Sequence, residues 1–155
     1  MEAASGSVFS APRRSRPEEA RAIADLWLRS RYASIPTIPA PVHTDDEVRA
    51  WFEFVVPERD LWVIAHDDRP VALLVLQGEW VDQLYVDPQW TGQRLGSVLI
   101  DLAKKLHPER LDLWVFQSNT PARRFYEQRG FVAIETTQGD NEERAPDVHY
   151  RWSNP

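Results

Sequence analysis

Residues 84–97 read LYVDPQWTGQRLGS, and this stretch decides how the rest of the chain is interpreted. Its first three residues end an apolar segment, a proline and two glycines follow, and residues 95–106 then repeat apolar side chains with helical spacing. The stretch therefore predicts a strand, a glycine-containing loop and the N-terminus of a helix. The first backbone N–H groups of a helix have no partner within it. Together with the helix dipole they favour an anion such as a phosphate.

Two glycines in this loop, Gly92 and Gly96, would let the backbone approach such a ligand closely. The same pattern also fits a plain connection between a strand and a helix, because short glycine patterns are not specific. Neither the lysine of a Walker motif nor the dinucleotide pattern G-x-G-x-x-G is present, which reduces the nucleotide ligands that the loop could hold.

Outward from this stretch, apolar periodicity and capping residues predict the remaining elements. Strands are expected at residues 8–11, 61–65, 71–76, 80–86, 111–116, 131–136 and 148–152. Four helices are expected. The first begins at the capping box Ser15/Glu18, and the second begins at the capping box Thr44/Glu47 and ends at Pro57. The third covers residues 95–106, and the fourth runs from its cap Thr120 to Gly130. This order predicts an α/β (α+β) fold with a mixed, mostly antiparallel sheet of six to seven strands and helices on both faces. The connection between residues 80–86 and 111–116 is expected to be a right-handed, parallel crossover.

The composition excludes several classes of protein. The chain has 155 residues, no cysteine, and 18 basic against 24 acidic residues, which gives a net charge of -6. The absence of cysteine excludes a disulfide scaffold, cysteine-ligated metal centres and a thiol nucleophile. The acidic balance argues against nucleic acid and anionic membranes as partners. We expect one cytoplasmic domain over residues 1–155, with residues 1–7 flexible, because no stretch has the length of a membrane span or the pattern of a secretory signal.

A second informative stretch is residues 119–131, NTPARRFYEQRGF. Ala122 and Tyr126 fall on one face of the helix expected here, with Phe125 beside them. By itself this spacing fits a core helix in which Tyr126 packs and finds a hydrogen bond for its hydroxyl.

The two stretches together resemble the GNAT superfamily of acyl-CoA-dependent N-acyltransferases. In that family a V-x-P segment precedes the loop motif Q/R-x-x-G-x-G/A, and a later motif reads N-x-x-A-x-x-x-Y-x-x-x-G-F. Here VDP at residues 86–88 precedes TGQRLG at residues 91–96. The later motif is matched by Asn119, Ala122, Tyr126, Gly130 and Phe131. The order of elements also resembles the family's fold along nearly the whole chain, and residues 141–147 resemble a segment of uncharacterised bacterial members.

Two positions depart from the family pattern. Thr91 stands where Gln or Arg is usual, and Arg94 stands where Gly is usual. We expect Arg94 to take helical dihedrals, which are open to any residue at a helix start. Its guanidinium could face a phosphate or crowd the loop, so the departure bears on the geometry and affinity of cofactor binding.

The resemblance implies an N-acetyltransferase that moves an acetyl group from acetyl-CoA, its co-substrate, to a primary amine by direct attack in a ternary complex. It implies no metal and no covalent enzyme intermediate. The residues implied to hold the cofactor are the strand edge at Leu84, Tyr85 and Val86, the loop at Thr91, Gly92, Gln93, Arg94, Leu95, Gly96 and Ser97, and the later motif at Asn119, Ala122 and Arg123. Arg124, Lys104 and Lys105 could also meet terminal phosphates, or form a solvated face.

Tyr126 resembles the general acid of the family, since a phenol with a pKa of about 10 can donate to a thiolate whose conjugate acid has a pKa of about 8.5. Asp82 is the expected general base, because strand alternation puts Asp82, Leu84 and Val86 on one face. The rival bases are Glu79, His43 and Glu135.

The acceptor implied by the resemblance is a small-molecule or peptide amine. Acidic residues at 45–53 and 140–147 could attract a cation, and Trp51, Trp80 and Trp90 could form a cation–π wall. Solvated loops and core aromatics account for the same residues.

The sequence leaves two alternative functions open. One is a CoA-binding regulator that has lost catalysis, motivated by Thr91 and Arg94, and the other is an interaction module without enzyme activity. A homodimer could form through an exposed tryptophan surface around Trp152.

Overall fold

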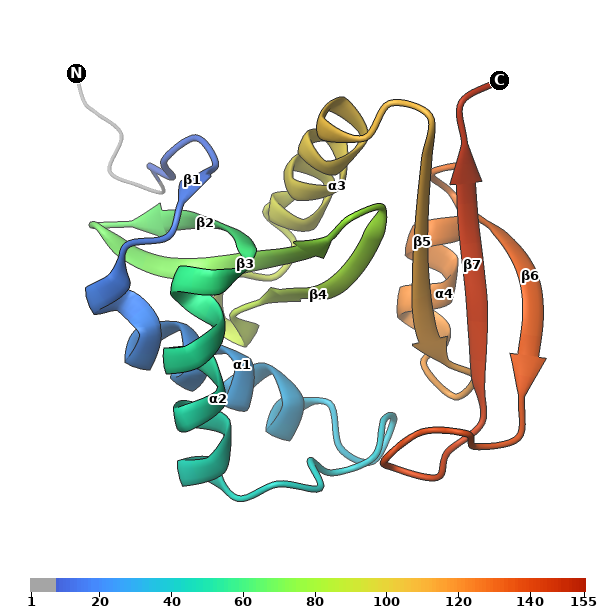
Figure 1. The fold of residues 1–155 in the computed structure, drawn as a ribbon, viewed down its shortest axis with the longest axis horizontal. Coiled ribbons are helices and arrows are strands. Elements are labelled where there is room, and N and C mark those ends of the chain that lie inside the picture. Colours follow the sequence, from blue (N-terminus) through green and yellow to red (C-terminus); the bar gives the residue numbers. More distant parts are fainter. Residues whose placement is uncertain (1–7) are drawn as a thin grey trace.

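The computed structural model describes residues 8–155 and is built on a seven-stranded sheet (Figure 1). The strands are β1 (Arg13–Arg14), β2 (Asp60–His66), β3 (Arg69–Gln77), β4 (Trp80–Val86), β5 (Arg110–Phe116), β6 (Val132–Thr137) and β7 (Asp147–Ser153). They lie in the order β1-β2-β3-β4-β5-β7-β6, and β4 and β5 form the parallel pair among otherwise antiparallel neighbours. The predicted mixed, mostly antiparallel sheet and its parallel crossover are confirmed. The expectation for residues 1–7 lies outside the described residues.

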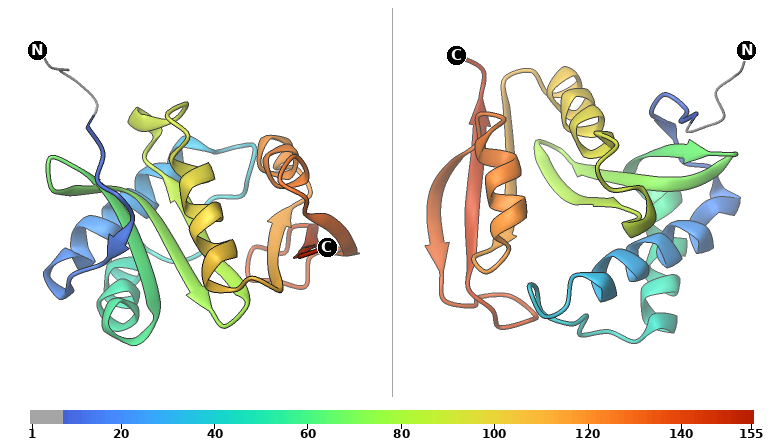
Figure 2. Two further views of the ribbon diagram at one scale, coloured as in Figure 1. Left: turned by 90° about the horizontal axis from the view of Figure 1, so that it is seen from above. Right: turned by 180° about the vertical axis from the view of Figure 1, so that it is seen from behind.

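Helices cover both faces of this sheet (Figure 2), as predicted. They are η1 (Pro17–Glu19), α1 (Ala20–Ala33), α2 (Asp45–Glu58), η2 (Pro88–Trp90), α3 (Leu95–Leu106) and α4 (Thr120–Glu127). On one face Phe52 of α2 shares a core with Leu73 of β3, and on the other Leu99 of α3 shares a core with Leu74. Leu73 and Leu74 are neighbours whose side chains point to opposite faces, so the continuous apolar run of β3 serves both cores. In the described part of the chain, none of the helices has the length and apolar character that a bilayer crossing requires.

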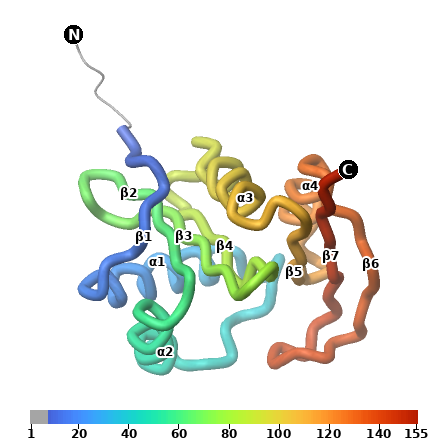
Figure 3. Tube along the Cα trace, turned by 45° about the horizontal axis from the view of Figure 1, so that its top comes forward, coloured from blue at the N-terminus to red at the C-terminus, as the bar shows by residue number. Residues whose placement is uncertain are grey.

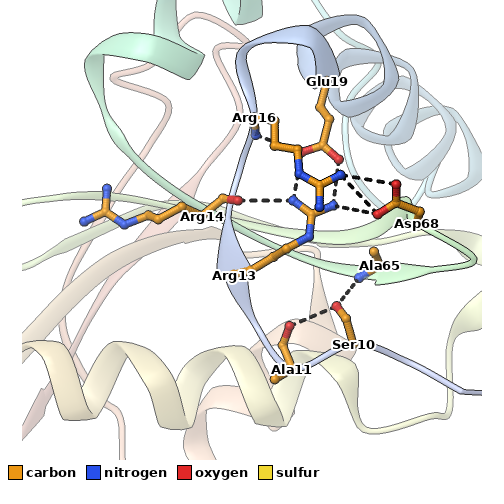
Figure 4. Close-up of polar contacts among 8 residues, drawn as sticks. All are labelled: Ser10, Ala11, Arg13, Arg14, Arg16, Glu19, Ala65 and Asp68. Carbon is orange, nitrogen blue, oxygen red and sulfur yellow. Dashed lines mark hydrogen bonds and ion pairs between the residues drawn. The ribbon is translucent and has the colours of Figure 1, made fainter.

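The first helical segment starts one residue later than predicted. The carboxylate of Glu19 accepts a hydrogen bond from the backbone N–H of Arg16 at 2.8 Å and is paired with Arg13 at 2.7 Å (Figure 4). The predicted capping pair of Ser15 and Glu18 is therefore wrong, because Glu19 is the acid that Arg13 holds at the edge of the sheet.

The edge strand predicted at residues 8–11 is displaced. The strand itself is β1, while Phe9 forms an isolated bridge with His66 of β2. Pro12 lies between the bridge and β1, and because it has no N–H it interrupts the hydrogen-bonded ladder.

The boundaries of α2 agree with the prediction at one end only. Thr44 and Glu47 form the predicted capping box. At the other end the helix continues through Pro57, because the N–H of Arg59 still donates to the carbonyl of Val55 at 2.9 Å. A proline so near the helix end leaves these last bonds intact.

The cap of α4 is Asn119 and not Thr120. Its side-chain oxygen accepts the backbone N–H of Ala122 at 3.3 Å, which is the usual geometry of an N-cap. Gly130 has a φ of 89° and ends the turn that follows the helix, as predicted.

Trp152, the centre of the expected tryptophan surface, is half-buried. The ring centroid of Trp152 lies 4.9 Å from Nζ of Lys104, and the ring packs on the core between the sheet and α3. Lys104 and the turn at Gly130 cover part of the indole, and a homodimer through this surface stays a prediction.

β4 and β5 lie side by side at one end and diverge toward the other (Figures 1 and 3). Trp80 pairs with Asp112, and within residues 8–155 no further residue pair joins these two strands. The edge of β4 beyond this pair is therefore left without a neighbouring strand.

β4 also carries a β-bulge at Asp82. Its neighbours Val81 and Gln83 pair with consecutive residues of β3, so Asp82 has no partner in that strand. Val81 and Leu84 consequently pack into the same core although they are three residues apart. The prediction that Asp82 shares a face with Leu84 and Val86 by simple alternation is wrong.

Candidate active site

The loop between η2 and α3 presents a row of backbone donors. Within the described residues, the backbone N–H groups of residues 91–97 donate to no other protein group, and the first bond of the helix joins the N–H of Val98 to the carbonyl of Arg94 at 3.1 Å. Residues 91–94 are exposed. Together with the positive end of the α3 dipole, these donors supply what the predicted anion site requires.

Gly92 and Arg94 both adopt left-handed backbone conformations, with φ of 81° and 63°. A Cβ added at Gly92 would meet no atom within 4 Å, so the loop is open on that side. The expectation of helical dihedrals at Arg94 is wrong. A positive φ is a conformation that glycine adopts at lower cost than arginine, which explains why glycine is usual at this position.

Gly96 and Ser97 face α4. A Cβ at Gly96 would lie 3.3 Å from Cζ of Phe125, so glycine lets the two helices approach closely. The hydroxyl of Ser97 accepts a hydrogen bond from Arg129, whose guanidinium lies 3.8 Å from the ring centroid of Phe125. The bare backbone of Gly96 and the hydroxyl of Ser97 thus join α3 to α4 and the turn after it, and the backbone N–H groups of both residues remain available as donors.

The start of the loop is anchored to α1. One oxygen of Asp87 accepts the N–H of Gln89 at 3.0 Å, and the other lies 2.6 Å from Nη2 of Arg29. We call residues 91–97 the anion loop. The contacts of Asp87 fix the end of β4 and the beginning of this loop relative to α1.

The open edge of β4 offers backbone groups to an extended ligand. Leu84, Tyr85 and Val86 pair with β3 along their other edge. Antiparallel pairing uses alternate backbone groups, so the remaining groups point toward the opening between β4 and β5. The carbonyl of Val86 is an exception, because Ser30 of α1 already donates to it at 2.8 Å.

Tyr126 is buried on α4, where its ring packs against Phe125 and Phe131 at centroid distances of 5.1 and 5.4 Å. None of the hydrogen bonds among residues 8–155 uses its hydroxyl. Burial and, to a smaller extent, the neighbouring Tyr85 raise the pKa of Tyr126 above its ordinary value. The phenol therefore stays protonated at neutral pH, and its hydroxyl is free to donate to a ligand.

The other predicted cofactor residues of α4 make contacts within the protein. Asn119 caps the helix, Ala122 packs against the core, and Nε of Arg123 donates to the hydroxyl of Tyr150 at 3.0 Å. Their role toward a cofactor stays a prediction.

Lys104 and Lys105 lie far from the anion loop. They occupy the last turn of α3, roughly 14 Å along the helix axis from its N-terminus. Lys104 donates instead to the carbonyl of Arg129 at 2.7 Å. Lys105 is exposed and Lys104 half-buried, and a contact of either lysine with terminal phosphates of the cofactor stays a prediction.

A cavity of about 380 Å³ opens between β4, α1, α2 and the β6–β7 loop. Its lining residues are Trp27, Arg31, Pro41, Val42, His43, Glu47, Val48, Trp51, Phe52, Gln83, Glu142 and Glu143. Aromatic and aliphatic side chains form most of the wall, and the glutamates add negative charge. Such a lining suits an amine carried on an apolar stem.

The inner end of the cavity is built around Arg31. Its Nη2 donates to the carbonyl of Pro39 at 3.0 Å and lies 3.6 Å from Glu143. Its guanidinium carbon lies 4.9 Å from the ring centroid of Trp27, and the indole N–H of Trp27 donates to Gln83 of β4 at 2.9 Å. α1, β4 and the β6–β7 loop are thereby held together around the cavity.

The β6–β7 loop is a closed turn that brings two glutamates to the cavity. The side chain of Asn141 donates to the carbonyl of Ala145 at 2.7 Å and accepts its N–H at 3.1 Å. Gly139 has a φ of 119°, and a Cβ there would lie 2.9 Å from the backbone of Arg144. Glycine at this position is therefore required for the loop to close.

The acceptor residues predicted from the sequence are separated by the fold. Trp51 and acids from both predicted stretches line the cavity. Trp80 instead stacks on His149 at 5.0 Å, and Trp90 lies 4.4 Å from the ring of His66. The expectation that these two tryptophans form a wall of the acceptor site is wrong, because they project from β4 and η2 toward other neighbours.

Of the predicted bases, His43 lines the cavity. The three carboxylates are paired outside the cavity: Asp82 with Arg59 at 3.2 Å, Glu79 with Arg110 at 3.5 Å, and Glu135 with His149 at 3.6 Å.

Sequence reasoning missed Trp27, Arg31 and Gln83. Trp27 reads as one member of the apolar stripe of its helix, and no local pattern pairs Arg31 with an acid more than a hundred residues away. The signal in the sequence that pointed to this region was the acidic composition of residues 45–53 and 140–147.

Comparison with known proteins identifies the family. The model of the acetyltransferase (GNAT) family matches residues 20–131. The peptidyl-lysine N-acetyltransferase YjaB of Escherichia coli is 34% identical over 132 residues, which cover 83% of this chain and 86% of the relative. The peptidyl-lysine N-acetyltransferase YiaC of the same organism is 26% identical over 136 residues, which cover 83% and 87%.

Solved structures share the fold. The apo form of YjaB from Escherichia coli superposes with a TM-score of 0.77 at 29% identity, covering 96% of this chain and 100% of that one. The PaiA N-acetyltransferase of Thermoplasma acidophilum, solved with coenzyme A, gives a TM-score of 0.65 at 14% identity, covering 95% and 99%. The chain thus belongs to the GNAT family of acetyltransferases, and it is an N-acyltransferase of that family.

Proposed function

We propose that this enzyme acetylates the side-chain amine of peptidyl lysine, using acetyl-CoA in a ternary complex. The observation that carries the proposal is the position of β4 between the two halves of the site. Gln83 of β4 lines the cavity, and a few residues later the same strand runs into the anion loop. An acyl donor held along the open edge of β4 would therefore lie next to an amine in the cavity.

The residues present fit acetyl-CoA. The N–H groups of residues 91–97 match a pyrophosphate, and the open side of Gly92 leaves room for it. The open edge of β4 suits the amides of a pantetheine arm. The likeness to a fold solved with coenzyme A is consistent with this assignment.

The bound thioester would supply the acetyl group. The neutral amine attacks the carbonyl carbon, and as the C–N bond forms and the C–S bond breaks, the nitrogen loses one proton and the sulfur gains one. Tyr126 is the proposed donor at the sulfur, because its hydroxyl is protonated and has no partner in the described residues. Because its raised pKa makes the phenol a weaker acid, the hydroxyl would first donate a hydrogen bond to the developing thiolate, and the proton would move only as the C–S bond breaks.

Glu143 is the proposed acceptor of the amine proton, directly or through water. Its side chain is 16% exposed, whereas those of Glu47 and Glu142 are 61% and 66% exposed, so it is the innermost of the lining carboxylates. Both Glu143 and Asp82 are paired with an arginine, and Asp82 is the less direct candidate because it does not line the cavity.

The choice of lysine rests on the cavity and on the relatives. Trp27, Trp51 and Phe52 offer apolar walls for a four-carbon stem, and the glutamates attract its charge. Two relatives are named peptidyl-lysine N-acetyltransferases.

The test is thiol release with acetyl-CoA and three acceptors: a peptide with one lysine and a blocked N-terminus, a peptide with a free N-terminus and no lysine, and a small diamine. We expect the lysine peptide to be preferred. Thermal unfolding with acetyl-CoA at about 100 times its dissociation constant should add roughly 2.7 kcal/mol of stability. Stabilisation without thiol release from any amine would favour a CoA-binding regulator, and no stabilisation would favour an interaction module.

A further inference from the structure

The cavity has a buried end and an exposed mouth that differ in chemistry. At the buried end, the side chain of Arg31 is 5% exposed and lies among aromatic rings. At the mouth, the side chains of His43, Glu47 and Glu142 are 52%, 61% and 66% exposed. A lysine side chain that enters tip first would place its reacting nitrogen deep in the cavity and its peptide backbone at this mouth.

A histidine of the chain itself lies between the two acids of the mouth. Nε2 of His43 lies 2.9 Å from Glu142, which is 99 positions away, and Nδ1 lies 3.6 Å from Glu47. The acids come from different elements, since Glu47 opens α2 and Glu142 lies in the β6–β7 loop. An imidazole held between two carboxylates marks a position that suits a positive charge.

We infer that Glu47 and Glu142 form a subsite for a second cationic group of the acceptor, and that protonated His43 fills this subsite when no acceptor is bound. The inference rests on the proposed function and names a narrower substrate class: lysines with an arginine or lysine beside them in the peptide. His43 and the flanking cation compete for the same two carboxylates.

The competition gives a pH dependence with a definite sign. The groups that face the histidine are Glu142 from the β6–β7 loop and Glu47 from α2, with Arg31 of α1 and Glu143 farther inside the cavity. Glu142 first, and Glu47 less, raise the pKa of His43 above its ordinary value. Below that pKa the imidazolium occupies the subsite. As the pH rises through it, the ring loses its charge and no longer competes with the acceptor for Glu142 and Glu47, although one oxygen of Glu47 still accepts the N–H of Thr44 in the cap of α2 at 2.8 Å.

Two matched peptides test the inference. One is acetyl-Gly-Arg-Lys-Arg-Gly-amide, and the other has glutamine in place of each arginine. The measured quantity is the kcat/KM of the arginine peptide divided by that of the glutamine peptide. Because both peptides share the reacting lysine, its titration cancels in this ratio. In the unmodified enzyme we expect the ratio to rise from near unity at about pH 6 to about fivefold at about pH 8.5, carried by KM and not by kcat.

Three variants complete the experiment. His43→Gln should show the ratio of about fivefold at every pH, and Glu142→Gln should hold it near unity at every pH. Glu53→Gln removes an exposed acid of α2 that does not line the cavity, and it should behave as the unmodified enzyme.

Equal acetylation of both peptides at every pH, or an unchanged ratio in Glu142→Gln, would overturn the subsite and leave the proposed function standing. If acetyl-CoA binds and neither peptide nor any other amine is acetylated, the proposed function fails and the subsite fails with it.

Discussion

Nη1 of Arg59 lies 3.2 Å from Oδ2 of Asp82, at the place where the bulge of β4 meets the junction of α2 and β2. The same guanidinium lies 5.7 Å from the ring centroid of Trp51, which lines the cavity proposed to hold the acceptor. Asp82 therefore supports the wall of the cavity through Arg59, and its carboxylate does not line the cavity itself.

The positions of Asp82 and Glu143 predict which of these two carboxylates matters more for turnover. We expect Asp82→Asn to lower kcat by less than about threefold, because a general base must reach the reacting amine and the carboxylate of Asp82 does not line the cavity. Glu143→Gln should lower kcat by about 10²-fold, as expected for loss of a general base. Thiol release at saturating acetyl-CoA measures both, and thermal unfolding checks that loss of the acid beside the buried Arg31 has not unfolded the protein. The opposite order of effects would return the role of base to Asp82.

Replacing the phenol of α4 separates chemistry from packing. Because the hydroxyl of Tyr126 has no partner in the described residues, Tyr126→Phe should change the free energy of unfolding by less than about 1 kcal/mol. Turnover should fall by about 10² to 10⁴-fold if the hydroxyl assists the departing sulfur. The loss should shrink with acyl donors whose thiol is more acidic. Unchanged turnover in a folded variant would show that the ring only packs.

The anion loop is tested by a pair of substitutions at one glycine. Gly92→Ala adds strain at a φ of 81° and a methyl group that meets no atom, so acetyl-CoA affinity should fall by less than about fivefold. Gly92→Glu adds the same strain and a negative charge beside the pyrophosphate, so affinity should fall by at least about 100-fold, or roughly 2.7 kcal/mol. Calorimetric titration with acetyl-CoA measures both constants. Equal affinities in the two variants would place the pyrophosphate elsewhere.

The arginine before α3 should be a site of backbone strain. Arg94 has a φ of 63°, so Arg94→Gly should raise the free energy of unfolding by up to about 1 kcal/mol, measured by chemical denaturation without ligand. A matched Arg124→Gly substitution inside α4 should instead destabilise by about 1 kcal/mol, because its backbone is helical. A loss of stability in Arg94→Gly would mean that the arginine side chain makes up for the strain of its backbone.

Much of the fold could be predicted because its determinants are close in sequence. Thr44 and Glu47 cap α2 as predicted, since a capping box needs only neighbouring residues. The apolar repeat of residues 95–106 predicted α3 with its observed bounds, because Leu95, Leu99 and Ala103 recur every fourth residue and face the same core. The continuous apolar run of β3 was likewise expected for a strand covered on both faces.

The candidate site was predicted in part. The loop and Tyr126 could be named because two local motifs carry them. The proposed base Glu143 and most of the cavity lining could not be named, because their positions depend on how distant elements meet. His43 and Glu142 are 99 positions apart and share one cavity, and no periodicity within either segment indicates that they meet.

The sequence by itself determined the elements, their order, the family motifs and the absence of cysteine chemistry, all of which follow from residue type and short-range spacing. Only the tertiary structure decided that Asp82 lies in a bulge, that Arg94 has a left-handed backbone and that Gly96 serves the contact with Phe125. The physical reason is that each of these depends on a neighbour from another element. The pairing register of β3 sets the bulge, the entry of the chain into α3 sets the dihedrals of Arg94, and the packing of α4 sets the space left at Gly96.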